Sequence, residues 1–356
     1  MSFLYVLILI VPALATALAF MPCSHWIIRS LDFPRVQIAT LCLVSLAFTA
    51  ANPPSVAWSA LFVALANLAA LFYQLYKIFP YTRLAKAEVL SSHGPDDDRT
   101  ISLLSSNVLT PNRRSDALLT LVRQYQPDLL LTLESDAWWQ NALISLEDDY
   151  PYRVAIPLAN LYGMHLYSRL PLENTEVLYR VQDDIPSIRS QVRLRSGEKI
   201  RIYCLHPTPP SPTESETSKP RDAELLLVGK QIRELDETAL VFGDLNDVAW
   251  SYSTRLFKKV SELLDARIGR GMFNTFHAHH RFLRWPLDHI FQSAEFQIKH
   301  MAKLPDIGSD HFPIYAKFQY CPAQEDLHDV ETADTEEIAQ ANEKIAEGRQ
   351  EAESQL

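Results

Sequence analysis

Charged side chains are missing from two long stretches near the N-terminus, and cysteine and glycine are scarce throughout. No Asp, Glu, Lys or Arg occurs from Met1 to Ile28 or from Val36 to Tyr76, and all nine glycines lie beyond residue 90. Uncharged apolar stretches of about 18 residues or more are typical of membrane spans. The few cysteines are too scattered for a disulfide framework or a paired zinc-ligand pattern: Cys23, Cys42, Cys204 and Cys321.

The overall composition, 47% hydrophobic residues and a net charge of −10, excludes wholesale disorder but averages three unlike regions. Residues 1–90 hold five basic and two acidic side chains, a net of +3. Residues 323–356 hold eleven acids and two basic residues, a net of −9, which leaves a net of −4 for 91–322. The middle region therefore has the size and charge of a catalytic domain.

The apolar N-terminal region predicts a three-helix transmembrane anchor over residues 1–90. Consecutive prolines in Asn52-Pro53-Pro54 interrupt the second stretch, because they remove backbone donors and push the preceding residue out of helical geometry. The expected spans are about 3–28, 34–51 and 55–79. A cleaved signal peptide is the alternative for the first span, but it requires a Lys or Arg before the apolar core, and none exists.

The basic residues of this region predict its orientation in the membrane. With three spans, Arg29 and Arg35 fall on the same side as Lys77, Arg83 and Lys86, and positive charge accumulates on the cytoplasmic side. The large domain is therefore expected in the cytoplasm. A count of two spans would reverse this conclusion.

Residues 91–99 are expected to be a linker, and residues 100–320 an α/β domain. Short apolar runs that predict strands alternate there with helical periodicity at 115–125 and 222–235, and no internal repeat is visible. The runs are 101–104, 129–133, 164–167, 191–195, 200–205, 239–242, 287–291 and 314–318. Residues 321–356 are acidic and poor in aromatics, which predicts a disordered or solvated helical tail; docking to a basic partner is the alternative.

Polar side chains follow these apolar runs at the points where strands would end. Each alone is more often a cap or turn residue than a catalyst. Together they form an ordered set that would meet at one rim of the domain. The set consists of Ser106-Asn107, Glu134, Cys204-Leu205-His206-Pro207, Gly243-Asp244-Leu245-Asn246-Asp247, Trp285-Pro286-Leu287-Asp288-His289 and Gly308-Ser309-Asp310-His311-Phe312-Pro313.

This ordered set resembles the endonuclease/exonuclease/phosphatase family, which includes DNase I, abasic-site endonucleases, neutral sphingomyelinases and inositol polyphosphate 5-phosphatases. Its most specific pieces are residues 243–246, similar to the family's G-D-x-N, and 309–313, similar to its S-D-H-x-P. The resemblance implies a four-layer α/β/β/α sandwich of the DNase I-like type over residues 100–320. The stretch 107–112, the run 206–210 and the apolar region look most like a bacterial membrane-anchored branch, which places the chain in the inner (plasma) membrane as a multi-pass protein.

The resemblance also implies a metal-dependent phosphoesterase that uses Mg²⁺, with Mn²⁺ able to substitute. A hard cation neutralises a nonbridging phosphate oxygen, and Mg²⁺ favours one or two carboxylates with the rest of its shell left to water and phosphate. Glu134 is the expected principal ligand. Asn107 would orient that carboxylate, and Asp310 would complete the metal shell.

The same resemblance assigns catalytic roles. Asp244 would activate the attacking water, and Asn246 would hold the water or the phosphate, since residues two apart share one face of an extended segment. His311 would contact the phosphate or act as base, with Asp288 fixing its tautomer. His206 would stabilise developing charge and protonate the leaving oxygen; which histidine is acid and which is base stays open.

Further residues are candidates for contacts with the substrate. Asn112, Arg281 and Arg284 are expected to bind substrate, the two arginines at its entrance. The cluster of His277, His279 and His280 matches no firm metal-ligand spacing, and a polar loop accounts for it better. Two residues depart from the family pattern. Leu133, before the metal ligand, replaces the usual Gln and would alter only the hydrogen bonding at the strand end. Leu109, two residues after Asn107, replaces an acid that joins the metal site in some abasic-site nucleases, which weakens the DNA-repair interpretation.

Charge and anchoring together favour a phosphate ester on a lipid as substrate. A protein that grips duplex phosphates tends to have a basic surface, whereas this domain has a net charge of −4. A membrane-associated nuclease is the main alternative, and a non-catalytic scaffold that binds phosphorylated ligands is a second one. No segment of the sequence singles out a protein partner.

Overall fold

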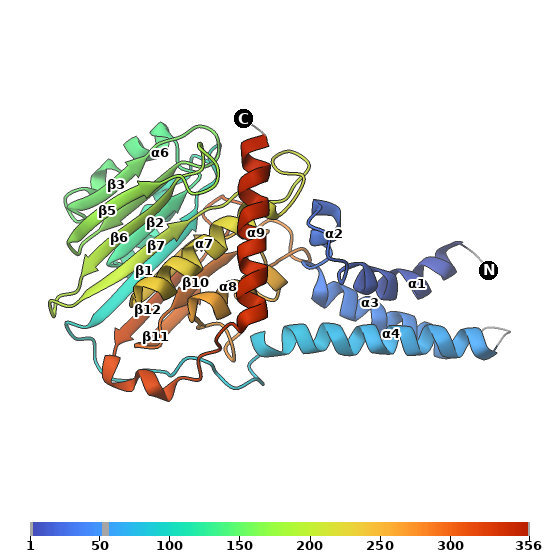
Figure 1. Cartoon of the computed structure of the whole chain (residues 1–356). Coiled ribbons are helices and arrows are strands. Elements are labelled where there is room, and N and C mark those ends of the chain that lie inside the picture. Colours follow the sequence, from blue (N-terminus) through green and yellow to red (C-terminus); the bar gives the residue numbers. More distant parts are fainter. Residues whose placement is uncertain (1–2, 52–56, 355–356) are drawn as a thin grey trace.

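The computed structural model describes residues 3–51 and 57–354, which fold into a two-sheet sandwich with a helical region projecting from one end (Figure 1). The helical region contains α1 (Phe3–Leu18), α2 (Trp26–Ser30), α3 (Arg35–Ala51), α4 (Ala57–Ile78) and the short 3-10 helix η1 (Phe79–Tyr81). Helices α1, α3 and α4 pack against one another through buried side chains that include Ile38, Cys42 and Leu71. The predicted break at 52–54 lies outside the described residues.

The sandwich contains two six-stranded sheets. The first has the order β11-β12-β1-β2-β4-β3 and consists of β1 (Thr100–Asn107), β2 (Leu129–Leu133), β3 (Tyr152–Ile156), β4 (Met164–Ser168), β11 (Phe296–Lys303) and β12 (Ile314–Tyr320). The second has the order β5-β6-β7-β8-β10-β9 and consists of β5 (Leu172–Leu178), β6 (Ser187–Arg193), β7 (Lys199–Leu205), β8 (Ala239–Asp244), β9 (Leu264–Asp265) and β10 (Asp288–Gln292). These two sheets confirm the predicted mixed α/β sandwich.

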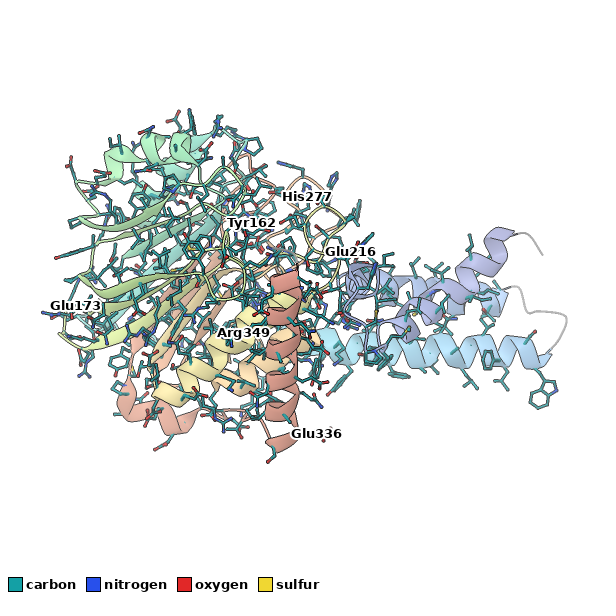
Figure 2. The ribbon with its side chains drawn as sticks, turned by 45° about the horizontal axis from the view of Figure 1, so that its top comes forward. Tyr162, Glu173, Glu216, His277, Glu336 and Arg349 are labelled. Carbon is teal, nitrogen blue, oxygen red and sulfur yellow. The ribbon has the colours of Figure 1, made fainter. Side chains whose placement is uncertain are left out.

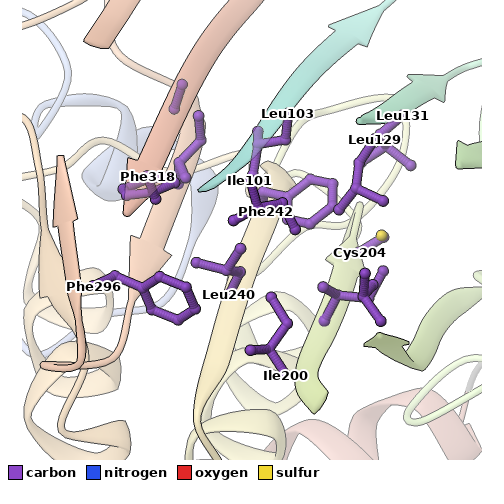
Figure 3. Packing of buried hydrophobic residues seen from close by; sticks show 14 of the residues in the cluster. Ile101, Leu103, Leu129, Leu131, Ile200, Cys204, Leu240, Phe242, Phe296 and Phe318 are labelled. Atoms are coloured by element: carbon purple, nitrogen blue, oxygen red, sulfur yellow. The ribbon is translucent and has the colours of Figure 1, made fainter. Parts of the chain in front are cut away.

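The core lies between the sheets, where alternate apolar residues of both inner faces meet (Figure 3). Leu103 and Leu131 of the first sheet and Leu240 and Phe242 of the second are fully buried there. Helices α5 (Ser115–Tyr125) and α6 (Ala137–Ala142) and the 3-10 helix η2 (Ile144–Leu146) cover the first sheet. Helices α7 (Lys219–Leu235) and α8 (Tyr252–Ser261) cover the second, which completes four layers.

The C-terminal segment differs from the expectation of a disordered or solvated tail. After the 3-10 helix η3 (Pro322–Leu327), helix α9 (Thr335–Ser354) lies across α7 and α8 (Figure 1). Ala341 and Ile345 are buried against α7 and α8, and Lys344 pairs with Asp222 at 2.9 Å. The acidic composition obscured a narrow apolar stripe with a spacing of about one helical turn, which supplies this docking face.

Two predicted boundaries near the N-terminal region were wrong. The first span was expected over 3–28, but α1 ends at Leu18 and the chain turns before α2 begins at Trp26. Residues 1–90 were assigned to the membrane region, yet Val89 is buried in the core between the sheets, and Ser92 bonds to the backbone of β11. The domain therefore takes in part of this segment and of the predicted linker.

Among the described residues, one helical segment is long enough to cross a membrane. Leu61–Tyr81 is helical over 21 residues and apolar enough to cross a bilayer. The apolar helices Leu9–Leu18 and Arg35–Ala51 are shorter.

Candidate active site

The strand ends bring five of the predicted residues to one rim of the sandwich. Asn107 ends β1, Asp244 ends β8, and Asp288 begins β10 directly opposite Asp244 in the antiparallel pair. Glu134 follows β2, and His206 follows β7. Because β1 runs parallel to β2, and β7 to β8, the carboxyl ends of these strands meet at the same edge.

His311 lies between two buried carboxylates. Its Nδ1 is 2.8 Å from Asp288 Oδ2, and its Nε2 is 3.4 Å from Asp244 Oδ2. Burial lowers the pKa of His311, but the two carboxylates outweigh burial and raise it to about 10. Burial likewise raises the pKa of Asp244, and the charges of His311 and His206 outweigh it, so that this pKa is lowered. His311 is therefore an imidazolium, and it lies beside the ionised carboxylate of Asp244.

Asn107 holds the carboxylate of Glu134, and the backbone of Glu134 is strained. Asn107 Nδ2 donates to Glu134 Oε1 at 2.7 Å and approaches Asp244 Oδ2 at 3.3 Å. Glu134 has φ 56°, a left-handed value that is uncommon outside glycine and typical of functional sites. Its Oε2 is buried without a hydrogen-bond partner among the described residues. Burial, followed by the nearby Asp310 charge, raises the pKa of Glu134 to about 7 despite the Asn107 bond.

The end of β8 depends on a glycine. Gly243 has φ 145°, and a Cβ at this position would lie 2.0 Å from the backbone oxygen of Leu205 on β7. This close approach of two parallel strands delivers Asp244 to the rim. Asn246 follows with φ 51°, donates from its backbone N to Asp244 Oδ1 at 3.0 Å, and donates from Nδ2 to Pro207 O at 2.9 Å.

His206 is a second histidine that approaches the Asp244 carboxylate. Its Nε2 is 3.9 Å from Asp244 Oδ2, and its ring contacts that of Tyr162 at 5.2 Å between centroids. Burial lowers the pKa of His206 to about 4. His206 is therefore neutral near pH 7, in contrast to His311.

These side chains surround a cavity of about 270 Å³ that the sequence only partly predicted. Asp310 and five of the predicted residues described above line it, as do several residues that carried no signal in the sequence. The complete lining is Phe33, Glu134, Leu161, Tyr162, His206, Pro209, Pro210, Glu214, Asp244, Asn246, Phe276, Leu287, Asp310 and His311. Figure 2 shows Tyr162 at the end of the sandwich nearer to the helical region, and Glu173 at the far end.

Two of the unpredicted residues reach the cavity from irregular segments. Phe33 comes from the loop between α2 and α3, in the helical region that precedes β1, the first strand of the sandwich. Tyr162 hydrogen-bonds the carboxyl group of Glu214, which lies in a loop rich in Pro, Ser and Thr. Neither has a local pattern that distinguishes it from an ordinary loop residue, so only the tertiary fold reveals them.

The three residues expected to bind substrate do not line this cavity. Asn112 Nδ2 bonds to the backbone oxygens of Val108 and Ile307, where it fastens one loop to another. Arg284 donates to Ala278 O at 2.8 Å and lies over the ring of Phe312. Arg281 is exposed on the same loop. Backbone carbonyls thus engage two of the three side chains, which accounts for their absence from the cavity wall.

The donor set fits a hard divalent cation. The cavity lining contains four carboxylates and no Lys or Arg, and the buried Oε2 of Glu134 has no hydrogen-bond partner among the described residues. Asp244, Asp288 and His311 also place ligand atoms within 4.8 Å of one another. In that trio, however, the Nδ1 of His311 already bonds Asp288, so the unpartnered Glu134 oxygen marks the better cation position.

Comparison with known proteins identifies the family. A model of the endonuclease/exonuclease/phosphatase family matches residues 104–311, over half of the chain. No curated protein matches the chain in sequence.

Solved structures agree in fold. Humanized D. rerio TDP2 is 20% identical with a TM-score of 0.51, covering 62% of this chain and 99% of its own. D. rerio TDP2 complexed with a single-strand DNA product is 19% identical, with a TM-score of 0.51, and the match covers 62% of this chain and 99% of that one. The human Nocturnin catalytic domain with bound sulfate is 16% identical, with a TM-score of 0.52, and the match covers 68% of this chain and 99% of that one.

Family members hydrolyse phosphodiester or phosphomonoester bonds and generally depend on a divalent metal. The matched segment contains every residue of the rim described above, on the expected two-sheet sandwich. The chain belongs to the endonuclease/exonuclease/phosphatase family and is a phosphoric ester hydrolase.

Proposed function

We propose that the protein is a membrane-anchored, Mg²⁺-dependent phosphoesterase whose substrate is a phosphodiester, phosphomonoester or pyrophosphate carried by a lipid. The observation that carries this proposal is the composition of the cavity wall. The wall combines carboxylates and histidines with apolar side chains, including Phe33 from the helical region. Such a wall suits a single phosphate group that is attached to an apolar chain.

Glu134 is the residue that would hold the cation, with Asn107 orienting its carboxylate and Asp310 completing the shell. The family's metal dependence and the free, buried Glu134 oxygen support this assignment. A bound Mg²⁺ supplies positive charge to a nonbridging phosphate oxygen. It would also stabilise the ionised form of Glu134, whose pKa burial otherwise raises to about 7.

Asp244 orients the attacking water and accepts its proton. This carboxylate is buried at the rim, its pKa is lowered by the neighbouring histidines against the effect of burial, and Asn107 Nδ2 approaches its Oδ2. An ionised carboxylate in a fixed position can hold a water in line with the leaving group. The Asn246 side chain, held by Pro207 O, lines the cavity beside it and would contact the water or the phosphate.

The two histidines differ in charge, which separates their roles. His311, cationic because of Asp288 and Asp244, would contact the phosphate and stabilise negative charge that develops in the transition state. Asp288 holds the ring in position through Nδ1. His206 is neutral and would hydrogen-bond the leaving oxygen. It cannot be the principal acid near pH 7 with its pKa at about 4.

Anchoring is supported by the exposed surface of the helical region. Large apolar side chains point outward along α3 and α4, with Phe62 75% and Phe72 62% exposed. Soluble proteins rarely expose contiguous apolar surface of this extent. The basic residues that flank α3 and α4 lie at the ends nearer to the sandwich, which supports a domain on the cytoplasmic side.

A loop beside the cavity connects the site to this region. Gln37 Nε2 of α3 donates to the backbone oxygen of Phe282 at 2.7 Å, and the Phe282 side chain is 82% exposed. The same loop contributes Phe276 to the cavity wall. An apolar substrate chain leaving the cavity would therefore meet apolar side chains on its way to the bilayer.

A membrane-associated nuclease is the second candidate function. One structural neighbour in the family fold, D. rerio TDP2, is complexed with a single-strand DNA product. A binding channel for a strand requires positive side chains along the backbone. The cavity here has four carboxylates and no Lys or Arg in its wall, so this candidate ranks below the lipid substrate.

The choice is tested with the purified full-length protein in detergent, Mg²⁺, and two substrates offered in parallel, a polyprenyl pyrophosphate in mixed micelles and a supercoiled plasmid. We expect release of phosphate from the lipid, with Phe33→Ser raising KM for it and leaving hydrolysis of bis-p-nitrophenyl phosphate unchanged. Plasmid nicking that is lost in His311→Ala, without any turnover of the lipid, would favour the nuclease. Absence of turnover on every substrate would favour a non-catalytic scaffold.

A further inference from the structure

A second cavity lies where the helical region meets α7, α8 and α9. It measures about 950 Å³ and shares no lining residue with the catalytic cavity. The segment between α1 and α2 and the end of α4 contribute to one side, and α8 and α9 contribute to the other. The cavity thus lies at the level where the proposed membrane spans end and the catalytic domain begins (Figure 1).

The wall of this junction cavity has an excess of positive charge. It contains six basic and four acidic side chains, in a chain whose net charge is −10. Four of the basic residues pair with carboxylates of the same wall. These pairs are Arg29 and Arg35 with Asp32, Lys219 with Glu347, and Lys344 with Asp222.

The remaining two cations, Lys77 of α4 and Arg255 of α8, lack such partners. Within residues 3–51 and 57–354, no carboxylate lies within 4.0 Å of either one. Arg255 donates from Nε to Ser251 O at 3.2 Å, and Lys77 lies over the rings of Tyr73 and Tyr76. Both side chains are only partly exposed. Two half-buried cations that face one cavity repel each other unless an anion lies between them.

Apolar side chains border the cavity on its membrane side. Phe20 and Met21, just beyond α1, are 60% and 47% exposed, and the ring of Phe20 lies 4.4 Å from that of Tyr73. Phe72 and Tyr76 continue this exposed apolar surface along α4. A ligand that extends from the two cations toward the bilayer would thus pass from a charged to an apolar environment.

We propose that the junction cavity binds the phosphate headgroup of an anionic lipid, with Lys77 and Arg255 on the phosphate and the acyl chains along Phe20 and α4. This inference rests on the membrane anchoring proposed above and is independent of the catalytic chemistry. Arg presents paired donors that match phosphate oxygens, and Lys supplies a compact charge at the same point. Since Lys77 belongs to α4 and Arg255 to α8, the bound lipid would fix the orientation of the catalytic domain relative to the membrane.

The test uses full-length protein in uncharged detergent micelles, with phosphatidylglycerol added and binding followed by native mass spectrometry. The double variant Lys77→Gln/Arg255→Gln should bind this lipid at least about tenfold more weakly. Arg83→Gln/Lys86→Gln removes the same charge near the membrane but outside the cavity and should bind like the parent. Lys77→Arg/Arg255→Lys keeps both charges and should retain binding, which separates loss of the site from loss of folding.

Three outcomes would overturn the inference: equal weakening in the two glutamine variants, equal affinity for phosphatidylcholine, or equal affinity for inorganic phosphate added without lipid. The first would indicate general attraction to charge, and the last a site for the free anion. The His311→Ala variant should bind phosphatidylglycerol like the parent. Binding in this variant distinguishes failure of the lipid site from failure of the proposed hydrolysis.

Discussion

Replacing Asp288 with Asn keeps the shape of the His311 site and removes one buried charge. Asp288 Oδ2 accepts from His311 Nδ1 at 2.8 Å, and Asp244 approaches the other ring nitrogen at 3.4 Å. Burial opposes the imidazolium, yet the two carboxylates raise the pKa of His311 from 6.5 to about 10. That shift corresponds to about 5 kcal/mol of net stabilisation of the charged ring.

If about half of this stabilisation belongs to Asp288, the variant loses about 2 to 3 kcal/mol where the transition state requires a fixed, charged imidazole. We therefore expect kcat to fall about 50- to 100-fold on bis-p-nitrophenyl phosphate, with KM nearly unchanged. The exposed Asp149→Asn removes a charge far from the site and serves as the control. A decrease in kcat of less than about threefold, or a change confined to KM, would refute the positioning role.

Three further predictions concern the fold and its dependence on pH. Gly243→Ala should abolish activity and lower the melting temperature, because its Cβ would overlap Leu205 O; normal activity would contradict the close approach of β7 and β8. Ile345→Ala should cost about 2 to 4 kcal/mol and expose α9 to limited proteolysis, whereas an unchanged cleavage pattern would mean that α9 does not dock in solution. Burial lowers the pKa of His165 to about 4, so the unfolded chain gains a proton below about pH 6.5 that the folded chain does not. The free energy of unfolding therefore falls by about 3 kcal/mol between pH 6.5 and 4 because of His165. The His165→Leu variant lacks this group, so its stability, followed by thermal unfolding, should fall by about 3 kcal/mol less than that of the parent over the same pH range; an equal fall in both would contradict this role of His165.

The residues that sequence reasoning placed at the rim were those that directly follow or begin regular strands. Asp244 and Asn107 end strands that are buried at every position, so the continuous apolar runs before them, together with the family motifs, were enough to locate them. The edge strands β3 and β5 escaped prediction because their residues are largely exposed and lack an apolar run. Residues that reach the cavity from irregular segments, such as Phe33 and Tyr162, depend on tertiary packing alone.

Two predictions that relied on charge composition were wrong for a common reason. The acidic segment around Ile345 reads as a solvated tail, since its apolar stripe occupies only one narrow helical face. Arg284 reads as a substrate contact because its charge is visible in the sequence, whereas the backbone carbonyl of Ala278 that engages it is not. Composition describes the side chains a segment has, and the fold determines which partners they meet.

The central claim is that Asp244 and a divalent cation together hydrolyse a phosphate ester at this rim. The direct measurement is the rate of phosphate release from a polyprenyl pyrophosphate in mixed micelles, by the full-length protein and by Asp244→Asn, each with Mg²⁺ and with excess EDTA. The account predicts turnover only for the parent with Mg²⁺, and a loss of about 100-fold or more in Asp244→Asn. Equal turnover by parent and variant, or turnover that EDTA leaves unchanged, would contradict it.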